Sequence, residues 1–117
     1  MKIDHVLAVV PVTDIAVARE WYTRLFGREP DNNPMGSLIE WRLTNSGWLQ
    51  VTADPDRAGK GLMNVAVDDL AAQVREVTGR GITVGEIQPV NKGVEVCSIT
   101  DPDGNVITLI GNFRVTY

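Results

Sequence analysis

Few side chains in this chain can take part in acid–base, nucleophilic or metal chemistry. The candidates are one histidine, His5, one cysteine, Cys97, and the carboxylates Glu40 and Glu95, with Arg42 two residues after Glu40. A carboxylate can act as a general base and a guanidinium can polarise an oxygen, which makes Glu40, Glu95 and Arg42 candidates for catalysis or ligand binding. No Ser-His-Asp set, glycine-rich phosphate loop or CxxC motif is present, so the common chemistries built on those motifs are not indicated.

The composition is typical of one soluble domain. The chain has 117 residues, of which 44% are hydrophobic and 22% charged, with a formal net charge of −4. It contains no basic run, which argues against a nucleic-acid partner. The single Cys97 fits a reducing cytoplasm. The longest apolar stretch, residues 6–12, is far shorter than the roughly 20 residues that span a bilayer, and no signal peptide is visible. We therefore expect a cytoplasmic protein with no nucleic-acid or membrane partner.

Two strand–helix units, whose helices begin and end at similar residues, follow one another along the chain. Residues 3–10 predict a buried strand, and a helix then begins at Thr13-Asp14 and stops at Gly27. The segment LMNVAV predicts a second such strand, followed by a helix that begins at Asp68-Asp69 and stops near Gly79 or Gly81. The stretch Val12 to Ala16 aligns with Val67 to Ala71, which indicates an internal duplication.

Each predicted helix is followed by β-like segments that turn residues separate. They are a short stretch around REP, then SLIEWRL and GWLQVTA in the first half, and ITVGEIQPV, GVEVCSIT and NVITLI in the second. The sequence therefore predicts an α+β fold of two βαβββ modules. We place module one at about 1–53, a polar connector at 54–60, module two at 61–111 and a tail at 112–117.

Strand alternation predicts which side chains pack under the helices and which line a cleft on the other face. In GWLQVTA, for example, Leu49 and Val51 are assigned to the core. In GVEVCSIT the same rule assigns Val94 and Val96 to the core, and Glu95 and Cys97 to the cleft. The predicted ligand-binding residues are Trp48, Gln50, Leu62, Asn64, Thr108, Leu7, His5, Glu40, Arg42 and Glu95. Apolar walls with a few polar groups are typical of a small-molecule pocket.

The segments VTDIAVAREWYTRLFG, VAVDDL and DPDGNVITLI, at these spacings, resemble the vicinal-oxygen-chelate superfamily. That group includes glyoxalase I, bleomycin-resistance proteins and extradiol dioxygenases, and the resemblance covers nearly the whole chain. It implies paired βαβββ modules around a cleft, with helices on the outer face, usually in a homodimer.

The same resemblance bears on metal binding. In the metalloenzymes of this group each module supplies one ligand from its first strand and one from its last, typically His and Glu. The corresponding positions here are Leu7 (or His5), Gln50, Leu62 and Thr108. Leucine coordinates nothing, and neutral amide and hydroxyl oxygens are poor replacements for carboxylates. We therefore expect no metal and no other cofactor.

Three functions agree with this pattern. The first is a metal-free protein that binds a small organic molecule, resembling the bleomycin-resistance members, and the acidic balance would suit a cationic ligand. The second is a lyase, isomerase or dioxygenase that works without the usual ion, with Glu95 or Glu40 as general base and Arg42 or Thr108 polarising an oxygen. The third is a dimeric scaffold with a vestigial cleft. The retained aromatic and polar cleft favours the first.

Overall fold

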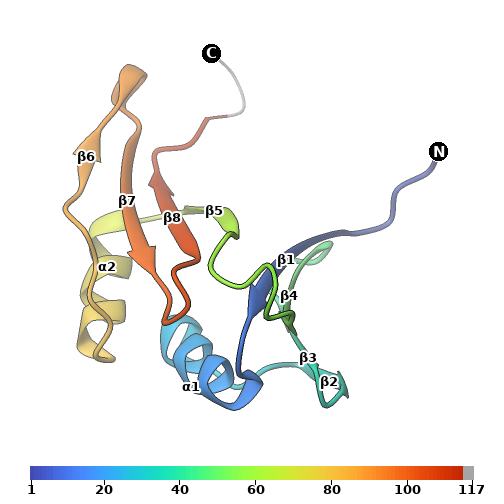
Figure 1. Ribbon diagram of the computed structural model, residues 1–117. Coiled ribbons are helices and arrows are strands. Elements are labelled where there is room, and N and C mark those ends of the chain that lie inside the picture. Colours follow the sequence, from blue (N-terminus) through green and yellow to red (C-terminus); the bar gives the residue numbers. More distant parts are fainter. Residues whose placement is uncertain (115–117) are drawn as a thin grey trace.

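The computed structural model describes residues 1–114 and contains two helices and two four-stranded sheets (Figure 1). The first half holds β1 (Val6–Val12), α1 (Ile15–Phe26), β2 (Asn32–Met35), β3 (Leu38–Arg42) and β4 (Gly47–Ala53). The second half holds β5 (Leu62–Val67), α2 (Leu70–Gly79), β6 (Gln88–Pro89), a short 3-10 helix (Asn91–Gly93), β7 (Glu95–Thr100) and β8 (Val106–Gly111). The predicted α+β fold is confirmed. The predicted tail, 112–117, lies partly outside the described residues.

The two sheets have the same topology. The first sheet has the order β1-β4-β3-β2 and the second the order β5-β8-β7-β6. In each, the first strand of the half pairs in parallel with the last, and the other pairs are antiparallel. The repeated order supports the internal duplication that the sequence indicates.

Both helices begin where the sequence places them. The carboxylate of Asp14 accepts from the backbone N–H groups of Ala16 (2.8 Å) and Val17, and Asp69 accepts from Ala72 (3.1 Å). These are N-caps, which satisfy backbone donors that have no partner inside the helix. Helix α1 ends at Gly27, which is left-handed at φ 72° and donates its N–H to the Thr23 carbonyl.

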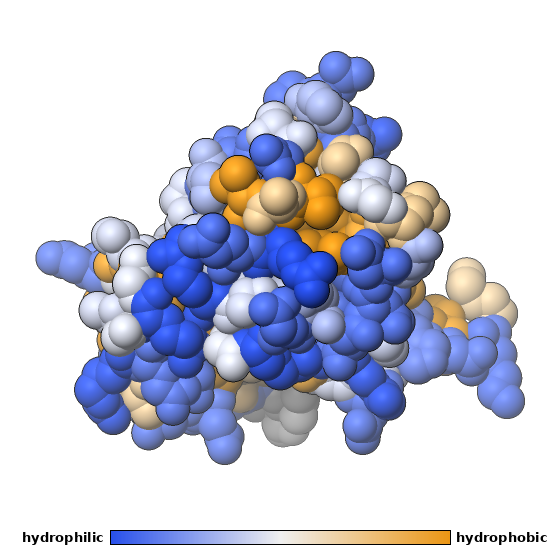
Figure 2. Space-filling view, turned by 90° about the horizontal axis from the view of Figure 1, so that it is seen from below, coloured by the Kyte–Doolittle hydropathy of each residue, from blue (hydrophilic) through white to orange (hydrophobic). Residues whose placement is uncertain are grey.

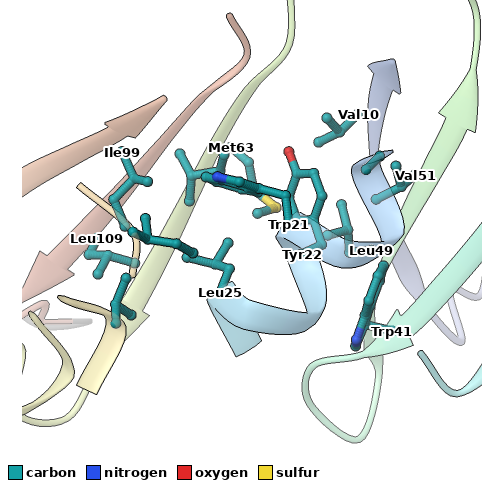
Figure 3. Close-up of a cluster of buried hydrophobic side chains, with 14 of the residues drawn as sticks. Val10, Trp21, Tyr22, Leu25, Trp41, Leu49, Val51, Met63, Ile99 and Leu109 are labelled. Carbon is teal, nitrogen blue, oxygen red and sulfur yellow. The ribbon is translucent and has the colours of Figure 1, made fainter. Parts of the chain in front are cut away.

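Helix α1 lies between the two sheets and packs against both (Figure 3). Tyr22 lies beside Val10, Leu49 and Val51 of the first sheet, and its ring also meets Trp41 at 6.1 Å. Trp21 and Leu25 point the other way, toward the side chains of the second sheet that Figure 3 labels as Met63, Ile99 and Leu109. The helix-facing sides of both sheets thus belong to one hydrophobic core, in which Trp21 and Trp41 are buried.

The turn Asp101-Pro102-Asp103-Gly104 and the following Asn105 join the two halves of the chain. Buried Asp101 accepts from the Tyr22 hydroxyl of α1 at 2.8 Å and from the Asn105 side chain at 2.8 Å. Asn105 in turn donates to the Pro11 carbonyl at 2.7 Å and accepts from the Gly61 N–H at 2.7 Å. Burial and the neighbouring Asp101 carboxylate raise the pKa of Tyr22. The segment is therefore an inter-module latch as well as a turn.

The outer strands differ from the sequence prediction. The strand predicted around REP lies a few residues later, at Asn32–Met35, and only Gln88–Pro89 of ITVGEIQPV is a strand. Both are outermost strands that pair with one neighbour, and all their residues are exposed. Such strands carry little hydrophobic alternation, because neither face has to be apolar.

Seen from below, the surface is largely hydrophilic, with one apolar area gathered among the hydrophilic side chains (Figure 2). Charged residues of α1 that face solvent include Arg19, Glu20 and Arg24. Within residues 1–114, neither helix is long and apolar enough to cross a membrane.

Candidate ligand-binding site

The face of the first sheet that points away from the helices carries three cross-strand rows of side chains. Strand register gives the rows as Leu7, Trp48 and Arg42; then Val9, Gln50 and Glu40; then Pro11, Thr52 and Leu38. This face therefore gathers five predicted site residues from strands that are separated in the sequence, namely Leu7, Glu40, Arg42, Trp48 and Gln50.

The middle row contains a polar pair. The Gln50 side chain donates to a Glu40 carboxylate oxygen at 2.6 Å, and the Asn32 side chain donates to the other oxygen at 3.4 Å. Glu40 and Gln50 are both half-buried. A carboxylate offers about four lone-pair positions, so Glu40 keeps capacity for a donor or a cation from a ligand. The pair places one carboxylate in the middle row, between the row that holds Trp48 and Arg42 and the row that holds Thr52.

Trp48 forms the aromatic part of this face. The Arg42 guanidinium lies 5.9 Å from the centre of the Trp48 ring and donates to the Asn45 carbonyl at 2.8 Å. A cation over an aromatic face is attracted by the ring quadrupole, which holds the half-buried indole in place. The Trp48 ring thus lies one row away from the Glu40 carboxylate.

The free face of the second sheet carries equivalent rows. They are Leu62, Val106 and Thr100; then Asn64, Thr108 and Ser98; then Ala66, Ile110 and Val96. The middle row consists of three side chains that can donate and accept hydrogen bonds. Thr108 occupies the position in β8 that Gln50 occupies in β4, so the two predicted equivalents are related by the duplication.

The structure corrects the assignment of β7. Cys97 pairs with buried Leu109, and Glu95 pairs with Gly111, so Glu95 shares the helix side of the sheet with Cys97 and Ile99. Glu95 therefore does not face Thr108, and Cys97 is a core residue whose thiol pKa is raised by burial. The segment has apolar residues at 94, 96, 97 and 99, which allows two alternation phases, and the sequence prediction chose the wrong one.

Sequence reasoning therefore missed Ser98, which the correct phase places beside Thr108 on the free face. Val9 was not predicted as a site residue for a different reason. Strand β1 is apolar at consecutive positions, so alternation does not show which of its side chains lie on the free face. His5 precedes β1 and is exposed, so the strand register does not bring it to the rows of the free face.

The donor set at the four ligand positions does not fit a divalent metal ion. Gln50 already donates its amide to Glu40, Thr108 offers a hydroxyl, and Leu7 and Leu62 offer no donor atom. Across residues 1–114, no cluster of three or more His, Cys, Asp or Glu side chains is arranged to hold a metal. No step of a metal-dependent reaction can be built on these residues.

The cross-strand rows of the two free faces do not face each other within the described chain, although Trp48 and Asn64 both line a pocket of about 330 Å³ where β1 and β5 approach each other. The opposite sides of both sheets pack around α1 in the shared core, so each free face is turned away from α1 (Figure 3). Glu40 and Gln50 consequently belong to one surface and Thr108 and Leu62 to another, while Trp48 and Asn64 lie at the pocket between β1 and β5.

Comparison with known proteins identifies the family. The sequence pattern of the Glyoxalase/Bleomycin resistance protein/Dioxygenase superfamily matches residues 2–109, and the chain belongs to this superfamily. A comparison with curated protein sequences gives no significant match.

Solved structures of the same fold agree. A glyoxalase/bleomycin resistance protein from Catenulispora acidiphila is 29% identical, with a TM-score of 0.86 over 92% of this chain and 96% of that one. TnmS3, an antibiotic binding protein from Streptomyces sp. CB03234, is 25% identical, with a TM-score of 0.77 over 95% and 98%. A bleomycin-binding protein crystallised with bleomycin is 21% identical, with a TM-score of 0.78 over 94% and 99%, and shares the fold.

Proposed function

We propose that this protein binds a small organic molecule without a metal ion, and that the ligand carries a cationic group next to an aromatic or apolar body. The observation that carries the proposal is the Glu40–Gln50 pair at the centre of the free face of the first sheet, one row from Trp48. Two similar structures, described as an antibiotic binding protein and a bleomycin-binding protein, support a small organic ligand. The buried, free Cys97 suits a cytoplasmic protein.

We further propose that the binding cleft forms in a homodimer. The free faces expose apolar side chains at Leu7 (45%), Val9 (54%) and Leu62 (83%), which a monomer would leave in water. β1 and β5, which carry them, are also edge strands. A two-fold dimer can bring the first sheet of one copy opposite the second sheet of its partner, which creates two equivalent clefts. Each cleft would then combine Glu40, Gln50 and Trp48 with Asn64 and Thr108.

Sedimentation equilibrium tests the assembly. We expect a dimer, and we expect Leu62→Lys to shift it toward monomer because a charge would be buried in the interface. Thr83→Lys is the matched control, since this exposed residue lies in the segment that follows α2, outside the strands. A wild-type protein that stays monomeric at high micromolar concentration would contradict the two-chain cleft.

Tryptophan fluorescence tests ligand binding. Titration with metal-free bleomycin and a panel of cationic aromatic antibiotics should quench the half-buried Trp48, and Trp48→Phe should remove the response because Trp21 and Trp41 are buried. Glu40→Gln should weaken the binding of a cationic ligand by about tenfold, as expected for one charge-assisted hydrogen bond. Quenching that survives Trp48→Phe would place the ligand elsewhere.

Elemental analysis of the purified protein, followed by titration with Zn, Ni, Mn and Fe(II), tests the metal-free part of the proposal. We expect no stoichiometric metal and no tight titration, because Leu7 and Leu62 supply no ligand atoms. One tightly held ion per cleft would refute this part and would make His5 and Glu40 the first ligands to test.

A further inference from the structure

A separate pocket lies on the helix side of the second sheet, between the C-terminal end of α1 and helix α2. Its volume is about 240 Å³. Its floor comes from β5 and β8, through Val65, Val67, Ile107 and Leu109, and its sides come from Leu25 and Phe26 of α1 and Val77 of α2. It therefore lies across the second sheet from the free face that carries Thr108, and none of the rows described above lines it.

Polar groups stand only at the α2 side of this pocket. Gln73, Glu76 and Arg80 line it there. The Arg80 guanidinium is already engaged, because it donates to the carbonyls of Arg24 and Leu25 (2.9 Å for Leu25) at the end of α1. No residue of the described chain forms a salt bridge with the carboxylate of Glu76. The pocket thus has apolar walls and two charged groups at its α2 side: the Arg80 guanidinium, which the carbonyls of α1 hold, and the carboxylate of Glu76, which has no ion-pair partner in the described chain.

The volume sets the size of the occupant. An apolar cavity of about 150 Å³ accommodates benzene, and a water molecule occupies about 30 Å³. A cavity of about 240 Å³ therefore holds a molecule of roughly ten non-hydrogen atoms. Drug-sized ligands need pockets of about 300 Å³ or more, so this pocket selects compact ligands.

We propose that this pocket is a second binding site, and that it takes a compact aromatic molecule with an ammonium group, such as a monocyclic arylalkylamine. The ring packs against Val67, Ile107 and Val77, and the ammonium group pairs with Glu76 and donates its remaining hydrogen bonds to water. The ligand touches α1 from the first half of the chain and α2 from the second half. The proposal does not depend on the function proposed for the free faces, because no residue is shared between the two sites.

The probes are benzylamine, benzyl alcohol and benzoate, which share one ring and carry a positive, a neutral and a negative group. Binding is followed by ¹H–¹⁵N correlation spectra of the full chain. We expect saturable shifts at the amides of Val65, Val67, Val77 and Ile107, with affinity in the order benzylamine, benzyl alcohol, benzoate. Shifts confined to free-face residues such as Gln50 and Thr108, or no saturable shifts with any probe, would overturn the proposal.

Two variants test the roles of the apolar pocket wall and of the Glu76 carboxylate. Val67→Phe fills part of the pocket and should weaken all three probes by at least roughly tenfold. Glu76→Gln should weaken benzylamine about twofold to fivefold, the range of an exposed ion pair, and leave benzyl alcohol unchanged. Glu86→Gln is the matched control, because Glu86 is exposed and does not line the pocket. Equal benzylamine affinity in Glu76→Gln and the control would refute the assignment of Glu76 even if Val67→Phe does not fold.

Discussion

Replacing Asp101 by asparagine tests the latch between the two halves of the chain. The residue Asp101 is 4% exposed, and its side chain accepts four hydrogen bonds. One oxygen faces the Tyr22 hydroxyl and the Asn105 amide at 2.8 Å each, and the other faces the backbone N–H groups of Asp103 and Asn105 at 3.0 and 2.8 Å. An asparagine of the same shape must turn its NH₂ group toward one pair of donors, so it loses two acceptor contacts.

The expected loss of stability is about 3–5 kcal/mol, because a buried hydrogen bond to a charged group contributes about 1.5–3 kcal/mol. Asn105 cannot compensate by rotating its amide, since its oxygen accepts from Gly61 and its NH₂ group donates to the Pro11 carbonyl. A domain of this length has a free energy of unfolding of roughly 6–18 kcal/mol, so the variant should still fold. The buried Trp21 and Trp41 report the transition in urea.

Two further variants and one control make the result interpretable. Tyr22→Phe removes only the phenol hydroxyl and should cost less than Asp101→Asn. The double variant should cost less than the sum of the two, because both single changes remove the same bond. Asp56→Asn, an exposed connector residue, should change stability by less than about 0.5 kcal/mol. A cost for Asp101→Asn equal to that of Asp56→Asn would refute the latch.

Three other outcomes follow from the structure. Gly59→Ala should lower the free energy of unfolding in urea by about 1–3 kcal/mol, because Gly59 has φ +85° and a Cβ there would lie 2.3 Å from the Asp103 carbonyl oxygen. Gly36→Ala is the control and should be neutral, since nothing lies within 4 Å of a Cβ at that position. The raised pKa of Tyr22 means that the folded state holds the phenol proton more tightly than the unfolded chain does. The resulting stabilisation is fully present below about pH 10, the pKa of tyrosine in the unfolded chain, and the free energy of unfolding should fall by up to about 1.4 kcal/mol per pH unit above it. Tyr22→Phe should abolish this loss. The raised pKa of buried Cys97 should make its reaction with a thiol reagent at pH 8 at least roughly tenfold slower than in urea, and equal rates would contradict its burial.

The elements that the sequence predicts well are those whose signals are local. Asp14 and Gly27 mark the ends of α1 because an N-cap carboxylate and a left-handed glycine satisfy the helix's own backbone groups. The core face of β4 was predicted correctly because Leu49 and Val51 alternate with more polar neighbours, and both are buried. The resulting rows bring Trp48 and Gln50 together on one face, as expected.

The errors arise where the deciding contacts are distant in the sequence. In β7 the apolar residues fit two phases, and the correct one is fixed by pairing with β8, where Cys97 meets Leu109. Glu95 was therefore assigned to the wrong face and Ser98 was overlooked. Register with a partner strand decides such cases, because a shift of one residue exchanges the two faces of a strand.

The DPDGN segment shows why the arrangement of the two halves could not be read from local pattern. As a sequence it predicts a turn, and it forms one. Its side chains, however, form hydrogen bonds with Tyr22 and Pro11, which lie 79 and 94 residues before their partners in the sequence. The corresponding turn of the first half, Asn45-Ser46-Gly47, has no such carboxylate, so the duplicated halves are joined by one asymmetric latch. That latch holds α1 against the helix side of the second sheet. The free faces are consequently turned away from α1, which leaves them available to the second copy of the chain in the dimer proposed above.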